Sequence, residues 1–229
     1  SDMTWVAMLL PFAAAVLAPW IVSRLGANGA WVLALAPALA FAHFAGFLTE
    51  IANGERVTGG YAWVPSLNLS FSWFIDGLSL TFALLITGIG TLIVLYAGGY
   101  MKGHPQQGRF IGFILLFMGA MLGLVVSDSF LMLFVFWELT SITSFLLIGF
   151  DHTREASRRA ALQALVVTGG GGLILLAGMI FIWNITGVSQ LSLLLSTGDA
   201  LRESPFYLAA LLLVLGGAFT KSAQFPFHF

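Results

Sequence analysis

The chain has 229 residues, of which 59% are hydrophobic and only 8% are charged, with a formal net charge of −1. This composition is typical of a polytopic membrane protein, because the surface of a water-soluble domain carries far more charge. The few basic residues are scattered, which argues against a nucleic-acid-binding surface. Because the chain has no cysteine, it offers no disulfide, iron–sulfur ligand or thiolate nucleophile of its own.

Seven stretches are apolar and long enough to cross a bilayer, since about 20 apolar residues span a hydrocarbon core of about 30 Å. The first has no basic region before it and is longer than a usual signal-peptide core, so we interpret it as a true span. We therefore predict an all-α polytopic membrane protein with seven transmembrane helices. The stretches are Thr4–Ser23, Ala30–Thr49, Leu78–Tyr100, Phe110–Val126, Phe130–Phe150, Ala160–Trp183 and Phe206 onward.

The positions of Lys and Arg between these stretches predict the orientation of the chain. Most basic residues lie on one side of the alternation of spans, whereas only Arg56 and Arg202 lie on the other. By the positive-inside rule, the first side is cytoplasmic and the amino terminus is outside. The residues on the cytoplasmic side are Arg24, Lys102, Arg109, Arg154, Arg158 and Arg159.

The loop before the third span, at about residues 50–75, changes to a strand-like periodicity. From Leu67 its apolar residues alternate with Asn and Ser, which is typical of a half-buried strand. Pro65 breaks any helix in this loop, and Asp76-Gly77 marks the turn into the third span. We therefore expect a short β-hairpin on the outer face. The alternating apolar residues are Leu67, Leu69, Phe71 and Trp73.

Glycine is frequent inside the predicted spans. Gly119 and Gly123 form a small-xxx-small pair, and Gly169–Gly172 form an uninterrupted run in the sixth span. Small residues let helix backbones approach closely in a membrane, where lipid provides no hydrophobic drive between helices. Close packing is the simpler interpretation, and the alternative is a flexible or locally unwound point in the sixth span.

Two residues are the only charges in their apolar stretches: Glu138 in the fifth and Lys221 in the seventh. A charge near the middle of such a helix costs about 2.5–3.5 kcal/mol on insertion scales and is rarely present without a function. Burial favours the neutral form of each group, whereas the approach of the other favours the ionised forms. The protonation of such a pair depends on its separation, as a proton pump or antiporter requires. The alternative is a structural buried ion pair.

Residues near the ends of the last spans extend this hypothesis. Pro226 has no N–H, so we expect the seventh helix to be broken close to Lys221, as in the interrupted helices of ion-coupled transporters. His228 is a candidate proton relay, although a lone His near a helix end is more often an interfacial hydrogen bonder. Asp151 and His152 are candidates for proton uptake on the cytoplasmic side, where solvated anchors are the simpler interpretation.

The sequences FWELTS at Phe136–Ser141 and SFLLIG at Ser144–Gly149 form one motif, and TKSAQFPFHF at Thr220–Phe229 forms another. The first resembles the fifth helix, and the second the lysine helix, of the antiporter-like subunits shared by Mrp-type cation/proton antiporters and respiratory complex I. The outer loop ending at Phe74–Ser79 is similar to theirs as well. The phenylalanines around Pro-Phe-His are more similar to the Mrp branch, and the resemblance runs over nearly the whole chain.

The resemblance implies roles for individual residues. Glu138 and Lys221 would be the acid–lysine pair of the family, with the acid modulating the proton affinity of the lysine, and His228 would pass protons onward. Family members have about twice as many core helices, in two inverted repeats, so we expect this chain to be part of a larger subunit. Residues 1–109 would hold three leading helices, and residues 110–229 the first four of a five-helix repeat, with the last broken near Pro226.

The functional prediction is a proton-translocating subunit of a multisubunit Na+/H+ antiporter in the cell membrane of a prokaryote. It is a secondary transporter subunit rather than an enzyme. Its partners would be other membrane subunits, lipid, H+ and Na+, with no cofactor, no metal site and no nucleic acid. One alternative is the equivalent proton-pumping subunit of a respiratory NADH:quinone oxidoreductase. The other is a purely structural scaffold, in which neutralising Lys221 would leave transport intact.

Overall fold

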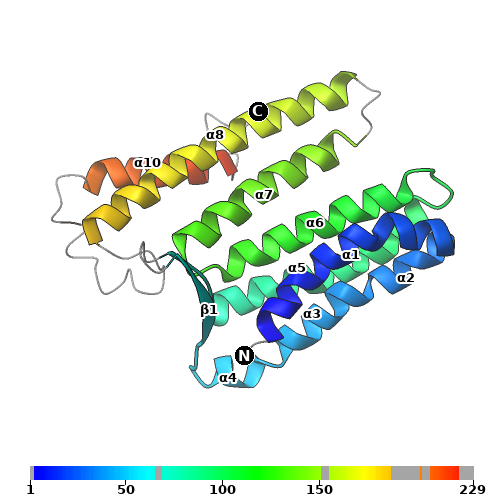
Figure 1. Ribbon diagram of the computed structural model, residues 1–229, viewed down its shortest axis with the longest axis horizontal. Helices are drawn as coiled ribbons and strands as arrows, with labels where there is room; N and C mark the ends of the chain where they lie inside the picture. Colours follow the sequence, from blue (N-terminus) through cyan, green and yellow to red (C-terminus); the bar gives the residue numbers. More distant parts are fainter. Residues whose placement is uncertain (1–2, 65–68, 151–154, 187–201, 203–206, 222–229) are drawn as a thin grey trace. The chain divides into compact units, whose positions relative to one another are not determined.

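The computed structural model describes residues 3–64, 69–150, 155–186, 202 and 207–221, with side chains described except at 61–64, 69–70 and 219–221. These residues are mostly helical (Figure 1). Their contacts divide the chain into two compact units. The first unit is Ser1–Gly59 with Phe74–Val126, and the second is Gly60–Trp73 with Ser127–Phe229.

The first unit is helical throughout most of its length. Gly26 and Gly103 have φ values of 62° and 80°, in the left-handed region that favours glycine, and they allow the chain to turn after α1 and after α5. The α5 helix begins at its N-cap Asp76, whose side chain accepts a hydrogen bond from the Ser79 N–H. The elements are α1 Met3–Leu25, η1 Gly26–Asn28, α2 Gly29–Leu33, α3 Leu35–Ala45, α4 Leu48–Ala52, α5 Gly77–Tyr100 and α6 Gln107–Val126.

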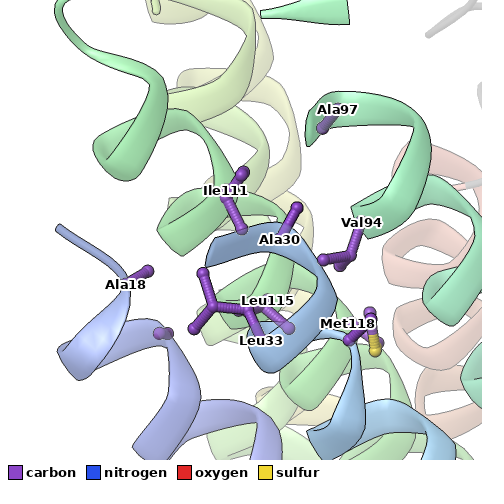
Figure 2. Close-up of a cluster of buried hydrophobic side chains, with 10 residues drawn as sticks. Ala18, Ala30, Leu33, Val94, Ala97, Ile111, Leu115 and Met118 are labelled. Atoms are coloured by element: carbon purple, nitrogen blue, oxygen red, sulfur yellow. The ribbon is translucent and has the colours of Figure 1, made fainter. Parts of the chain in front are cut away.

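A cluster of buried apolar side chains from α1, α2, α5 and α6, with Ala34 between α2 and α3, forms the core of the first unit (Figure 2). The cluster combines alanines with larger side chains. The alanines let the helices approach closely, and the larger side chains fill the space between them. Figure 2 shows the side chains of Leu33 and Leu115 close together, with Val94 and Met118 beside them. The cluster consists of Ala15, Ala18, Ala30, Leu33, Ala34, Val94, Ala97, Ile111, Leu115 and Met118.

Glycines of α6 bring this helix against α1. A Cβ on Gly108 would lie 2.7 Å from the Cα of Pro19, and one on Gly119 would lie 2.9 Å from the ring of Phe12. Both distances are too short for a side chain to be added without movement of a neighbour. The packing role predicted for Gly119 is therefore confirmed.

In the second unit, α8 packs against both α7 and α10, and Figure 1 shows α8 and α10 side by side. The α7 helix begins after Ser129, whose hydroxyl accepts a hydrogen bond from the Met132 N–H at 3.1 Å. Phe130, Leu175 and Met179 are buried at the α7–α8 contact. The helices are α7 Phe130–Ile148, α8 Glu155–Thr186 and α10 Tyr207–Lys221.

A two-stranded sheet, β1 Val57–Val64 and β2 Leu69–Ile75, occupies the loop in which the alternating pattern predicted strands. Trp73 on β2 forms an isolated antiparallel bridge with Ser127, and the Asp128 N–H donates to the Ser72 carbonyl at 2.9 Å. These bonds attach β2 to the segment that precedes α7. The presence of strands here is confirmed, whereas their location on the outer face remains a prediction.

Five segments of the described chain are long and apolar enough to cross a membrane, so the predicted total of seven is not confirmed. The first segment, Met3–Ala52, contains two of the predicted spans within one nearly continuous helical stretch. The last predicted span is represented by the shorter apolar helix Tyr207–Ala218. The other segments are Gly77–Tyr100, Gln107–Val126, Phe130–Ile148 and Glu155–Thr186.

Candidate functional site

Glu138 lies on α7, and its carboxylate points into the second unit. The residue as a whole is half-buried, but its Oε1 atom is fully buried. The helix that carries it is apolar from Phe130 to Trp137, and Glu138 is followed by Leu139. The predicted lone charge is therefore held inside the helical packing, where its charge state matters most to the surrounding groups.

The wall opposite this carboxylate is the backbone of α8 at Gly172. A Cβ on Gly172 would overlap Glu138 Oε1, and it would lie 2.9 Å from Glu138 Cδ and 3.1 Å from Trp137 Cδ1. The carboxyl group therefore occupies the space that any side chain at position 172 would need. Glu138 and Trp137 together form the α7 side of this contact.

Lys221 is the last residue of α10, and its side chain lies outside the described part of the structure. One turn before it, Gly217 lies so close to α8 that a Cβ there would be 2.5 Å from Leu175 Cβ and 2.7 Å from the Gly171 carbonyl oxygen. Gly171 and Gly172 are adjacent residues of α8. Gly172 lies against α7, which carries Glu138, and Gly171 lies against α10, which ends at Lys221. The close approach of Glu138 and Lys221 stays a prediction.

Buried hydroxyl groups follow Glu138 along α7, and our sequence analysis did not identify them as candidates. Thr140, Ser141 and Thr143 are each 1% exposed. Thr140 and Ser141 donate to the Trp137 carbonyl at 2.6 and 3.2 Å, and Thr143 donates to the Leu139 carbonyl at 2.9 Å. Their oxygens place hydrogen-bond acceptors within an apolar helix. The signal for them was four hydroxyl residues close together after the only charge of the span, Thr140, Ser141, Thr143 and Ser144.

The other predicted site residues lie outside the described residues. Pro226 and His228 follow the end of the described α10, and Asp151 and His152 fall between α7 and α8. The helix break at Pro226, the relay role of His228 and proton uptake at Asp151 and His152 stay predictions.

The glycine run of the sixth predicted span lies within α8, which is α-helical without interruption from Glu155 to Thr186. A locally unwound point at Gly169–Gly172 is therefore not observed. Close packing is confirmed at Gly172, whereas a Cβ on Gly169 or Gly170 would meet no atom of the described structure within 4 Å. Within the described part of the chain, no group of three or more His, Asp or Glu residues is arranged to hold a metal ion.

Two family models match the sequence. "NADH:quinone oxidoreductase/Mrp antiporter, TM" matches residues 127–229, and "NADH-Ubiquinone oxidoreductase (complex I), chain 5 N-terminus" matches residues 62–111. The first match includes both Glu138 and Lys221.

Curated relatives are similar to nearly all of this chain. The probable A/B-type subunit of a K(+)/H(+) antiporter from Rhizobium meliloti is 44% identical over 98% of this chain and 22% of its own length. The A-type subunit of a Na(+)/H(+) antiporter from Alkalihalophilus pseudofirmus is 42% identical over 97% of this chain and 28% of its own length. The chain therefore spans about a quarter of the length of these relatives.

Two solved structures have a similar fold. The Mrp complex from Dietzia sp. DQ12-45-1b matches with a TM-score of 0.86 and 29% identity, over 98% of this chain and 24% of the matched chain. The membrane-bound sulfane sulfur reductase, an archaeal respiratory membrane complex, matches with a TM-score of 0.71 over 92% of this chain and 33% of the matched chain. At 19% identity, the second match supports the fold alone.

Proposed function

Because the chain belongs to the family of membrane subunits shared by NADH:quinone oxidoreductases and Mrp antiporters, we propose that it forms part of the A-type subunit of an Mrp-type monovalent cation/proton antiporter. The observation that carries the proposal is the 42% identity to the A-type subunit of a Na+/H+ antiporter over 97% of this chain. The respiratory alternative has less support, because both curated relatives described above are antiporter subunits.

In the proposed mechanism, Lys221 carries the proton and Glu138 controls its proton affinity. An ionised carboxylate close to the amine favours the ammonium form, and separation of the two groups in a region of low dielectric favours proton release. Both helices pack against α8, which gives the two groups a common structural neighbour. Movement of protons inward through these groups would drive cations outward.

The remaining predicted residues would complete the proton path. Asp151 and His152 would collect protons at the cytoplasmic side, and His228 would pass them onward from Lys221. A break of the last helix at Pro226 would allow the backbone around Lys221 to change conformation. The buried hydroxyls of α7 could accept hydrogen bonds from water, since a hydroxyl that donates its own proton to a backbone carbonyl retains its acceptor lone pairs.

The proposed setting is the cell membrane of a prokaryote, with the amino terminus outside and with other antiporter subunits as partners. No cofactor is required, since charge movement alone couples the two ions. These 229 residues contain no cysteine, so labelling of Lys102→Cys by a membrane-impermeant maleimide can be compared with labelling of the unsubstituted assembly. Labelling from outside intact cells would refute the proposed orientation.

The transported cation must be determined by experiment, because one relative is named for Na+ and the other for K+. The test is the cation-induced collapse of a proton gradient in inverted vesicles that carry the complete assembly. We expect Na+, K+ or both to collapse the gradient in the wild type, and Glu138→Gln to slow this exchange by about tenfold or more, since the variant cannot ionise. Failure of both cations to act on the wild type would refute antiport. A Glu138→Gln variant with normal exchange would refute the role of the acid.

A further inference from the structure

We propose that Gly172 is a positioning residue for Glu138: the absence of a side chain at position 172 creates the space that fixes the carboxyl group against the backbone of α8. The inference rests on the proposed function, because it concerns the same proton-transfer group. It adds a residue on a second helix to the control of that group.

Glycine is needed at position 172 because a side chain there would overlap Glu138, and not because of its backbone conformation. Gly172 lies in the interior of a continuous α-helix, and its φ lies outside the left-handed region, so alanine could adopt the same backbone. Glycine in a helix interior is even unfavourable, by about 1 kcal/mol relative to alanine. The contact with Glu138 and Trp137, which needs the space at position 172, offsets this cost of glycine.

Two neighbouring glycines of the run, Gly169 and Gly170, do not make this contact. Both lie on the same helix, and a Cβ on either would meet no neighbouring atom of the described residues within 4 Å. At Gly172 the same atom would overlap Glu138 Oε1. Gly170→Ala is therefore a matched control, because it makes the same chemical change two residues away.

A methyl group at position 172 should move the carboxyl group and leave the helices in place. The atom it would overlap is the far end of a flexible side chain, which can rotate away, while Trp137 Cδ1 at 3.1 Å needs to yield by only a few tenths of an ångström. A group that transfers or controls protons is sensitive to displacement of about 1 Å, which can reduce a rate by up to about 100-fold.

The experiment compares Gly172→Ala with Gly170→Ala in the complete assembly, at equal amounts of assembled complex in inverted vesicles. We expect Gly172→Ala to reduce cation-dependent proton exchange by about tenfold and to shift its pH profile, and Gly170→Ala to match the wild type. Wild-type exchange and an unchanged pH profile in Gly172→Ala would overturn the proposal. Failure of Gly172→Ala to assemble, with Gly170→Ala assembled, would also overturn it, since the helix contact itself would then require the glycine.

A second variant links the effect to the carboxyl group. Glu138→Asp shortens the acid by one methylene and withdraws it from position 172. We expect Gly172→Ala to cause little further loss of exchange in the Glu138→Asp background, whereas independent effects would multiply. The Glu138→Gln variant separates the two hypotheses: if it retains exchange, the proposed function fails at this residue, and if it loses exchange while Gly172→Ala does not, only the positioning role fails.

Discussion

Asp76 caps the N-terminus of α5 with its carboxylate. Its Oδ1 accepts hydrogen bonds from the Ser79 N–H at 2.9 Å and from the Ser79 hydroxyl at 2.7 Å. Partial burial alone would raise the pKa of Asp76, but these bonds and the nearby Arg56 guanidinium outweigh it and hold the pKa below its ordinary value of 3.8. The ionised form is therefore the one that the fold stabilises.

The lowered pKa of Asp76 predicts how its contribution to stability changes with pH. Because the folded-state pKa of Asp76 is lowered, its contribution to stability is complete above about pH 3.8 and is lost as the pH falls through the folded-state value. We expect Asp76→Ala to reduce stability at neutral pH by about 1 kcal/mol, through loss of the N-cap.

The measurement is the thermal midpoint of the purified assembly, compared between wild type and Asp76→Ala at neutral pH and below pH 3.8. The difference should shrink at the lower pH. Asp76→Ser is the control, because it retains an N-cap acceptor without a titratable charge. A difference between wild type and Asp76→Ala that stays constant across this range would contradict the account.

Glu138 could be chosen as a candidate from sequence because a lone charge in an apolar span is costly and therefore informative. The role proposed for Gly172 could not be predicted in this way. Four consecutive glycines point in different directions around a helix, and only the rotation of α8 about its own axis decides which of them faces α7. Almost all residues of α8 that flank the glycine run are apolar, so no polar face of the helix indicates its rotation.

At the scale of helices, α6 shows how small residues determine the distance between neighbours. The Gly108 position contacts backbone, since its added Cβ would lie 2.7 Å from Pro19 Cα. Gly99, on α5, is exposed and has nothing within 4 Å of the same added atom. Backbone cannot rotate away as a side chain can, so the two positions should respond differently to the same substitution.

We expect Gly108→Ala to destabilise the α1–α6 contact by about 1–3 kcal/mol through overpacking. Gly99→Ala should be neutral or slightly stabilising, since alanine has the higher helix propensity. The thermal midpoint of the purified assembly should fall for the first variant only. Equal midpoints for Gly108→Ala and the wild type would show that α1 can move aside at no cost.

The existence of the helices could be predicted more reliably than their ends or their number. Length and apolarity locate α5, α6, α7 and α8 close to their predicted positions. They also predict a break between Thr4–Ser23 and Ala30–Thr49, where α1 ends at Leu25 and the chain turns at Gly26, although residues 3–52 form one nearly continuous helical stretch. The strand β2 could be anticipated in position from its two-residue alternation, since that period differs from the helical one, whereas β1 is expected only as the other strand of a hairpin.

At the scale of the whole molecule, the chain divides into two compact units. The first unit is held by the apolar cluster of α1, α2, α5 and α6. The second contains Glu138, the buried hydroxyls and the helix that ends at Lys221. The residues that carry the proposed chemistry are therefore all in the second unit, and the family model that includes antiporters in its description matches this part of the chain.

The central claim is that Lys221 alternates between a charged and a neutral amine, and replacement by arginine tests it most directly. Arginine keeps the positive charge but does not release its proton at physiological pH. In inverted vesicles with equal amounts of assembled complex, we predict that Lys221→Arg abolishes cation-dependent proton exchange as fully as Lys221→Ala does. Exchange that persists in Lys221→Arg while it is lost in Lys221→Ala would show that only a fixed charge is needed, and that Lys221 is one half of a structural ion pair.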